Sequence, residues 1–229
     1  MITFEAIKND PAIKTYITKA DESLVALGYT EHCFAHVMKV ASTAKYILET
    51  LGYSEREIEL AQIAGYLHDI GNLINRSEHA QSGAIMAFRI LDHMGADPED
   101  IATVVTAIGN HDEGTAEAVN PVAAALILAD KTDVRRSRVR NPNTIAFDIH
   151  DRVNYSVKKA TTRINEDHTA IELKLTIDTE SFSAMEYFEI FLTRMLLCRK
   201  AAAKLNCPSQ QKSKRNARKP QNIFDQRMP

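Results

Sequence analysis

The segment Gly65–Asn72, which reads GYLHDIGN, places His68 beside Asp69 at the end of an apolar helical pattern. A carboxylate that enters a protein interior is costly unless a salt bridge, a network of hydrogen bonds or a metal ion compensates its charge. Other ionisable side chains continue apolar helical stripes in the same way, so we expect them to point into the core as well. These are His36, His79, His111 and Asp130.

A divalent metal centre is the simplest explanation for four histidines and two aspartates that all face inward. Neutral imidazole together with carboxylate suits Fe, Mn, Zn or Co, and does not suit Ca²⁺, which prefers oxygen ligands alone. Six ligands are more than one catalytic ion takes while it keeps a position for water. Two ions bridged by Asp69 would use all six, and His68 and Asp69, which point about 100° apart on a helix, can reach adjacent coordination positions.

Helix signals dominate the first 140 residues and would position these side chains. The pairs Asp10-Pro11, Asp97-Pro98 and Asn120-Pro121 each combine a capping residue with proline at the first helical position. Ser54 and Glu57 have the spacing of a capping box. The fold class is therefore all-α, with a helical domain over residues 1–140. We expect its helices over residues 11–28, 30–52, 54–69 and 77–95, and further ones from 98 and from 121.

The pattern changes after Pro142. Residues 171–178 alternate apolar and polar side chains, which predicts a half-buried strand, and residues 160–165 are its expected partner. Apolar residues recur at helical spacing over residues 185–199, which predicts a long helix packed on this hairpin. We therefore expect residues 141–207 to form a small C-terminal appendage of β-hairpin plus helix.

The formal net charge of −2 at pH 7 hides an uneven distribution. Residues 208–229 hold six Lys/Arg and one acidic residue, so the rest of the chain carries 22 basic against 29 acidic residues. The body is thus not expected to bind nucleic acid. The tail over residues 208–229 is polar, basic and without period, which predicts that it is disordered.

Several classes of protein are excluded by what the sequence lacks. No run of about 18 apolar residues and no apolar N-terminal segment is present, so we expect a cytoplasmic protein without a membrane span. The three cysteines form no CxxC pair and are expected to be free thiols. No GxSxG, GxxxxGK[ST] or GxGxxG motif points to another chemistry.

Together the motifs resemble those of the HD-domain (HDIG) metal-dependent phosphohydrolase superfamily. EHCFAHVMKVA is similar to the segment with the family's first histidine, LHDIGN to its His-Asp doublet, and ILAD to its closing aspartate. HAQSGA and IGNHDE are similar to the two extra histidines of the binuclear branch. The resemblance covers residues 30–135 and implies two divalent ions, iron or manganese, with zinc, cobalt, nickel and magnesium as alternatives. The ligands that it implies are His36, His68, Asp69, His79, His111 and Asp130.

The reaction that the resemblance implies is hydrolysis of a phosphate ester or anhydride of a nucleotide-type substrate by a hydroxide that bridges the ions. A metal-bound water is acidic enough to need no separate general base. Asp69 is then a catalytic residue that steers the nucleophile, and Lys131 or a metal-bound water can protonate the leaving group. The basic segment DKTDVRRSRVR offers Lys131, Arg135 and Arg138 for substrate binding, because arginine gives paired donors to phosphate. Arg76 is a weaker candidate.

Two alternatives use the same ligands. One is an HD-fold oxygenase with a mixed-valent di-iron pair, and the other is a non-catalytic module that senses a nucleotide. Nucleoside monophosphates, dinucleoside polyphosphates, cyclic dinucleotides and alarmones all remain open as substrates, and the appendage can line the pocket or form a contact in a homodimer. His32 could partner the ligands because it lies one turn before His36, but we expect it at the surface. The other histidines expected at the surface are His93, His150 and His168.

Overall fold

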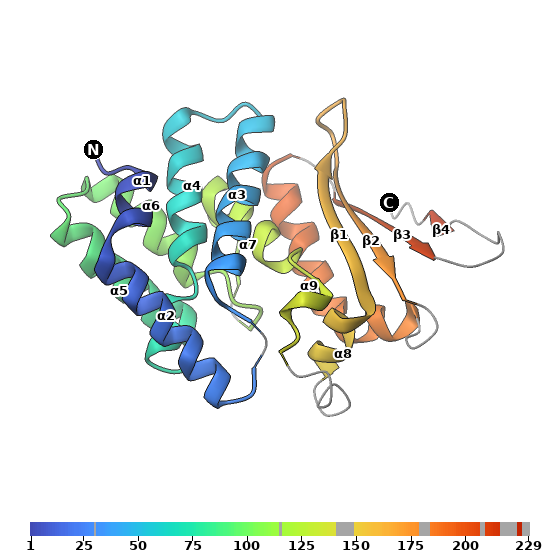
Figure 1. Cartoon of the computed structure of the whole chain (residues 1–229). Coiled ribbons are helices and arrows are strands. Elements are labelled where there is room, and N and C mark those ends of the chain that lie inside the picture. The colour runs from blue at the N-terminus through green and yellow to red at the C-terminus, as the bar shows by residue number, and fades with distance from the viewer. Residues whose placement is uncertain are drawn as a thin grey trace. The chain divides into compact units, whose positions relative to one another are not determined.

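The computed structural model describes residues 1–29, 31–114, 116–140, 149–178, 184–206, 209–215 and 224–225. The chain divides into two compact units, Met1–Asp130 and Lys131–Pro229. The first unit is helical, and the second combines helices with a small sheet (Figure 1). This confirms the predicted fold class, a helical domain followed by a C-terminal hairpin and helix. The division falls ten residues before the boundary expected between residues 140 and 141.

The first unit contains seven α-helices and one 3-10 helix among its described residues. They are α1 (Phe4–Asn9), α2 (Pro11–Ala26), α3 (Phe34–Thr50), α4 (Glu55–Leu67), η1 (Ile70–Leu73), α5 (His79–His93), α6 (Pro98–Gly109) and α7 (Pro121–Lys131), the last of which ends one residue into the second unit.

Local capping explains where several of these helices begin. The Asp10 carboxylate accepts a hydrogen bond from the backbone N–H of Ile13 at 2.9 Å, and Asn120 Oδ1 accepts one from Ala123 at 2.7 Å. Ser54 and Glu57 form the predicted capping box. Each cap satisfies backbone donors that have no partner inside the helix. The starts of α2, α4 and α7 therefore agree with the sequence prediction.

Several boundaries differ from the prediction by two to four residues. Helix α3 begins at Phe34, behind Cys33 as its cap, and not at Thr30. Helix α4 ends at Leu67, two residues before the predicted end at residue 69, and η1 follows it. Helix α5 begins at His79, two residues after the predicted start. The short helix α1 was not expected, because six residues are too few to show a helical period.

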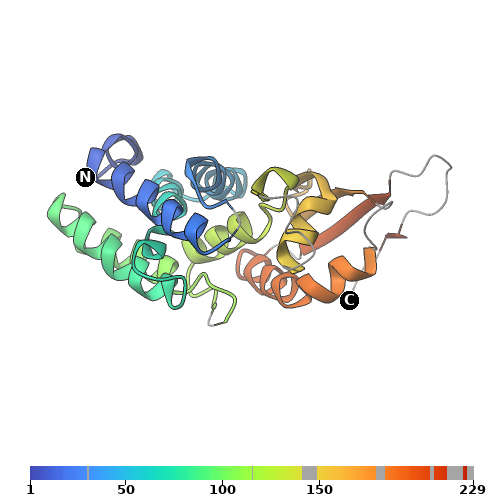
Figure 2. The same ribbon diagram turned by 60° about the horizontal axis from the view of Figure 1, so that its bottom comes forward.

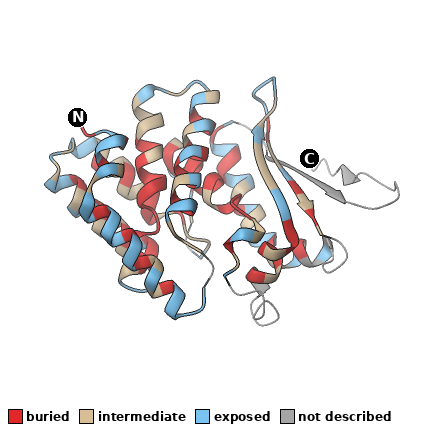
Figure 3. Ribbon diagram, in the orientation of Figure 1, coloured by how far each residue is buried: buried red, intermediate tan, exposed pale blue. Residues whose placement is uncertain are grey.

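Close packing of α3 on α4 organises the core of the first unit. A Cβ atom at Gly65 of α4 would lie 2.8 Å from the Cα of Ala41 on α3, so only glycine allows this approach. In α7, every residue from Val122 to Ala129 is buried, as the continuous red on this helix shows (Figure 3). Asp130, which follows this run directly, therefore lies at the end of a fully enclosed stretch of helix.

The second unit is built on a β-hairpin. Its elements are η2 (Arg136–Arg138), α8 (Ile149–Ser156), β1 (Val157–Ile164), β2 (Ile171–Ile177), α9 (Ala184–Lys204), β3 (Ser209–Arg215) and β4 (Phe224–Asp225). Strands β1 and β2 pair antiparallel, from Val157 opposite Ile177 to Ile164 opposite Ile171. The hairpin expected from the alternating pattern is confirmed.

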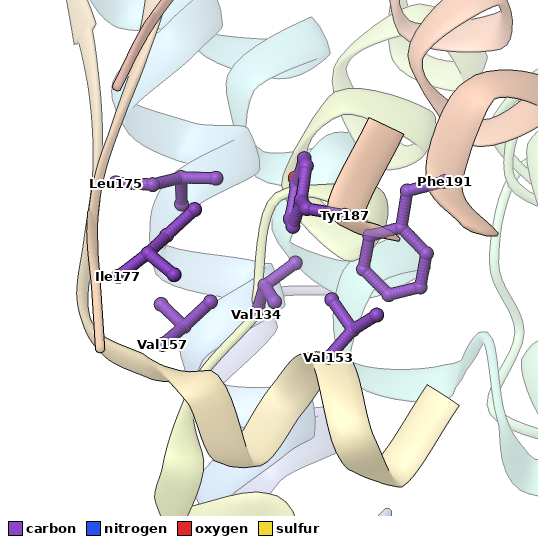
Figure 4. Packing of buried hydrophobic residues seen from close by; sticks show 7 residues of the cluster. All are labelled: Val134, Val153, Val157, Leu175, Ile177, Tyr187 and Phe191. Carbon is purple, nitrogen blue, oxygen red and sulfur yellow. The ribbon is translucent and has the colours of Figure 1, made fainter. Parts of the chain in front are cut away.

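Helices α8 and α9 lie on the same face of this hairpin (Figures 2 and 4). Alternate strand residues point to this face and meet aromatic side chains of α9, which explains why only every second residue of β2 is apolar. The buried cluster between these elements consists of Val134, Val153, Val157, Leu175, Ile177, Tyr187 and Phe191 (Figure 4).

Strands β3 and β4 correct the expectation of a wholly disordered tail. Strand β3 runs parallel to β2, with Ser209 opposite Ile171 and Arg215 opposite Ile177, and β4 pairs antiparallel with β3. A strand edge offers backbone donors and acceptors that a polar segment can pair with as well as an apolar one. Composition therefore did not reveal this pairing. Within the described residues, no helix is long and apolar enough to cross a membrane.

Candidate metal centre

The six side chains singled out in the sequence meet in the first unit. Each of them lies at or near the end of a helix, and His36 lies in the first turn of α3. Asp69 and His68 follow α4, His79 opens α5, His111 follows α6, and Asp130 is the last but one residue of α7. Five segments that are distant in the sequence thus contribute one or two ligands each.

Asp69 occupies the middle of this set. Its Oδ2 lies 3.2 Å from His68 Nε2 and 3.5 Å from His36 Nε2. Its other oxygen, Oδ1, lies 3.5 Å from His79 Nε2. The two oxygens therefore face different histidines, which is the arrangement that a carboxylate needs in order to bridge two cations.

Asp130 completes the set beside His36 and His68, and His111 completes it beside His68 and His79. Asp130 Oδ1 lies 3.4 Å from His36 Nε2 and 3.7 Å from His68 Nε2. The His111 ring lies 5.0 Å from the His68 ring and 5.1 Å from the His79 ring, centroid to centroid. Ligand atoms come within 4.8 Å of one another in two groups that could hold a metal ion. These groups are His36, His68 and Asp130, and His68, Asp69 and His111.

Backbone carbonyl groups orient three of the imidazoles. In each case Nδ1 hydrogen-bonds the carbonyl oxygen three residues earlier in the chain. The carbonyl oxygen is an acceptor only, so Nδ1 carries the proton and Nε2 keeps its lone pair. Such bonds are typical of metal-binding histidines, because they fix the ring and its tautomer. The pairs are His68 with Gly65 at 2.9 Å, His79 with Arg76 at 3.1 Å, and His111 with Ile108 at 2.6 Å.

Two buried atoms at the centre lack a hydrogen-bond partner. They are His68 Nε2 and Asp69 Oδ2, which face each other at 3.2 Å without making a hydrogen bond. Nearly all buried polar atoms in proteins are satisfied, so an orphaned lone pair beside an orphaned carboxylate oxygen calls for a further partner. Both atoms are Lewis bases. A divalent cation satisfies both at once, so these residues fit a metal ion.

Asp69 is held in its anionic form. Burial raises the pKa of its carboxyl group, but the neighbouring imidazoles of His68, His32 and His36 outweigh this when they are protonated, and they then hold that pKa well below its usual range. Asn72 Nδ2 also donates to Asp69 Oδ1 at 3.0 Å and to the Asp69 carbonyl oxygen at 2.9 Å. The carboxylate is thus charged and fixed in direction, as a metal ligand must be.

Gly71, the glycine of the HDIG motif, allows η1 and α5 to meet. A Cβ atom here would clash with the carbonyl oxygen of His79 and would lie 2.5 Å from the backbone nitrogen of Gly83. Ser82 Oγ donates to the Gly71 carbonyl oxygen at 3.3 Å across the same junction. The absence of a side chain at Gly71 therefore brings His79 within reach of Asp69.

His32 corrects one of the predictions. Its side chain is only 10% exposed, and its Nε2 lies 4.0 Å from Asp69 Oδ2, so it is not a surface residue. Its ring contacts that of His36, with 5.5 Å between centroids, and its backbone N–H donates to Asp21 Oδ1 at 3.2 Å. The spacing of four residues from His36 was the available signal. Asp112 was also missed; its Oδ1 lies 4.0 Å from His79 Nε2.

The basic residues proposed for substrate binding lie in the second unit. Arg135 donates to Asp133 Oδ1 at 3.0 Å and to Ser137 Oγ at 2.6 Å. Arg138 is buried and donates to the carbonyl oxygen of Asp133 at 3.1 Å. Lys131 is also buried, as the last residue of α7. Their role toward a substrate stays a prediction.

Comparison with known proteins agrees with this geometry. The family model of the HD domain matches residues 33–135, a range that contains all six converging side chains. Residues 33–135 thus match the HD domain, and this range covers most of the first unit. The branch with two metal ions is not specified by this match.

Two relatives extend the comparison. The uncharacterized protein MJ1020 of Methanocaldococcus jannaschii is 28% identical over 205 residues, which cover 79% of this chain and 78% of that protein. Because 79% of the chain is more than the first unit, this similarity reaches into the second unit. The crystal structure of a predicted HD superfamily hydrolase from an uncultured Thermotogales bacterium has 25% identity and a TM-score of 0.44, and the likeness covers 59% of this chain and 75% of that one.

Proposed function

We propose that this protein is a metal-dependent phosphohydrolase that cleaves a phosphate ester or anhydride of a nucleotide-type substrate. The match of residues 33–135 to the HD domain supports a metal-dependent hydrolase. The observation that carries the proposal is the pair of orphaned Lewis bases, His68 Nε2 and Asp69 Oδ2, inside a convergent set of four histidines and two aspartates.

Two divalent ions, iron or manganese, suit this donor set. His36, His68 and Asp130 would hold one ion together with Asp69 Oδ2. The other would be held by two histidines, His79 and His111, together with Asp69 Oδ1. When bound, such ions lower the pKa of a coordinated water and polarise the phosphoryl oxygens of a substrate.

The protein's own residues then orient and protect the reacting groups. Asp69 stays anionic at neutral pH and is directed by Asn72, so it can steer the attacking water. Hydrogen bonds to backbone carbonyl groups hold the rings of His68, His79 and His111 toward the centre and fix their tautomers. Lys131 follows Asp130 directly in α7 and is our candidate for protonating the leaving group.

The experiment is a phosphate-release screen over a panel of nucleotides, run without oxygen in Fe(II) and in Mn(II), with elemental analysis of the same samples. We expect turnover by metal-loaded protein and neither metal nor turnover in Asp69→Ala. His93→Ala is the matched control, because His93 is exposed at the end of α5 and should retain both. Metal-dependent consumption of dioxygen without phosphate release would contradict the proposal, and so would nucleotide binding without turnover.

A further inference from the structure

Arg76 lies beside the metal centre, in the turn between η1 and α5. Its carbonyl oxygen accepts the hydrogen bond from His79 Nδ1 at 3.1 Å, so the backbone that carries Arg76 also sets the orientation of a proposed ligand. Its guanidinium nitrogen Nη1 lies 3.4 Å from His79 Nε2, the atom that faces Asp69 Oδ1, and 3.4 Å from Asn72 Oδ1. The cation therefore sits at the edge of the ligand set, on the His79 side.

The groups that contact this guanidinium are all uncharged when the histidine is neutral. Among the described residues, no carboxylate lies within 4.0 Å of Arg76, and the remaining contact is the Tyr29 ring, whose centroid is 5.9 Å from the guanidinium carbon. Arg56 in the same unit shows the usual alternative. It is paired with Asp100 and Glu59 and keeps both partners at hydrogen-bond distance. Within the described part of the chain, Arg76 thus forms no ion pair with a carboxylate, unlike Arg56.

A cation next to a metal ligand has a physical consequence. Arginine cannot lose its proton in a protein, so an ion bound at His79 and the guanidinium would repel each other across a short distance. An anion that contacts both the ion and the guanidinium offsets this repulsion. A phosphoryl group suits the position, since its oxygens can contact the metal while the guanidinium donates to them in a paired geometry.

We infer that Arg76 forms, together with the His79 side of the metal centre, the subsite that binds the phosphoryl group of the substrate. This inference rests on the proposed function, and it assigns the binding of the phosphoryl group to a residue of the first unit. Tyr29, whose ring lies against the guanidinium and is 39% exposed, orients it from the solvent side. Asn72 connects the subsite to Asp69, because its Oδ1 faces Arg76 while its Nδ2 donates to the carboxylate.

The test measures binding of inorganic phosphate to the full-length chain loaded with Mn(II), by isothermal titration calorimetry. Arg76→Met should bind phosphate about 10- to 100-fold more weakly than the unsubstituted protein, as expected for loss of charge-assisted hydrogen bonds. Arg76→Lys should lose less, because it keeps the charge without the paired donors. Manganese content should be unchanged in both. Arg89→Met is the matched control, since Arg89 is exposed on α5 and makes no contact with the ligand set.

Three results would overturn the inference. They are equal phosphate affinity in Arg76→Met and the unsubstituted protein, absence of phosphate binding by the loaded unsubstituted protein, and loss of manganese from folded Arg76→Met. The last would mean that Arg76 only supports His79. Circular dichroism verifies the fold, and Arg76→Gln replaces the Met variant if that one does not fold. Phosphate binding that depends on Arg76, without release of phosphate from any ester, would keep the subsite and reject the proposed reaction.

Discussion

The first unit of the chain buries four histidines and Asp69 against one another, whereas the second unit is closed by seven apolar side chains. An apolar cluster stabilises its unit by removing its own surface from water and needs nothing further. A cluster of Lewis bases has the opposite property, because its desolvated lone pairs require a cation. The comparison teaches that the first unit gives up part of its core to a cluster of Lewis bases, whereas the charged groups buried in the second unit include cations as well as carboxylates, namely Lys131, Arg138, Asp133 and Asp151.

The largest effect should follow from removing the charge of Asp69 while keeping its shape. Asp69→Asn keeps the size and shape of the side chain but removes the negative charge of the carboxylate that faces both sets of histidines. We expect loss of bound metal and a fall of about 100- to 1000-fold in the rate of phosphate release. Elemental analysis and a steady-state assay measure the two quantities. Full metal content in Asp69→Asn would contradict the role given to this residue.

A substitution in the second unit should affect stability and not metal content. Phe191→Ala removes a fully buried ring from the apolar cluster and should lower the free energy of unfolding by about 3–5 kcal/mol. Urea denaturation measures this change. The manganese bound per folded chain should equal that of the unsubstituted protein. Leu192→Ala is the control. The neighbouring Leu192 is 53% exposed, so its substitution should lower the free energy of unfolding far less.

Removing the metal should destabilise the protein by a smaller amount. An ion that binds the folded state alone contributes about 2.7 kcal/mol when its concentration is 100 times its dissociation constant. Chelation should therefore lower the midpoint of thermal unfolding, and Mn(II) should restore it in proportion to its concentration. Asp69→Asn should show no such response. A response of equal size in Asp69→Asn would mean that the ion acts elsewhere in the chain.

The sequence predicted much of the fold because the relevant signals are local. Asp10, Ser54 and Asn120 cap the helices that follow them through hydrogen bonds within three residues. The ligands were found in the same way, since each continues an apolar stripe of its own helix and stripes from packed helices must meet in one core. Neither inference needed to know how the helices are arranged.

The features that sequence reasoning missed depend on contacts between distant segments. His32 lies outside any helix, and its place beside Asp69 follows from the bond of its backbone to Asp21 of α2. Arg76 was expected only as a weaker candidate, because the course of the turn that carries it is set by the junction of Gly71 with α5. Strand β3 pairs with β2 through backbone groups, which carry no side-chain signal. The helical periodicity of the sequence carries no information on any of these three features.

His32 provides the smallest and most discriminating prediction. Its imidazole lowers the pKa of the Asp69 carboxyl group, so His32→Gln should raise that pKa from its depressed position. A carboxylate with a depressed pKa keeps its charge down to low pH and loses it as the pH falls through that pKa. In His32→Gln the loss of Mn(II) on acidification should therefore begin at a higher pH than in the unsubstituted protein. At pH 7.5 we expect Mn(II) affinity to fall by about 10-fold, as for other residues that support metal ligands.

Calorimetric titration of Mn(II) at pH 7.5 and pH 5 measures this difference, with His93→Gln as the control on the exposed end of α5. A complete loss of metal in His32→Gln would make His32 a ligand in its own right and enlarge the centre to seven side chains. Unchanged affinity at both pH values would mean that His32, although it lies beside Asp69, does not act on the metal centre. An intermediate loss that grows on acidification would place His32 between these limits, as a group that keeps Asp69 charged, since its Nε2 lies 4.0 Å from the carboxylate oxygen.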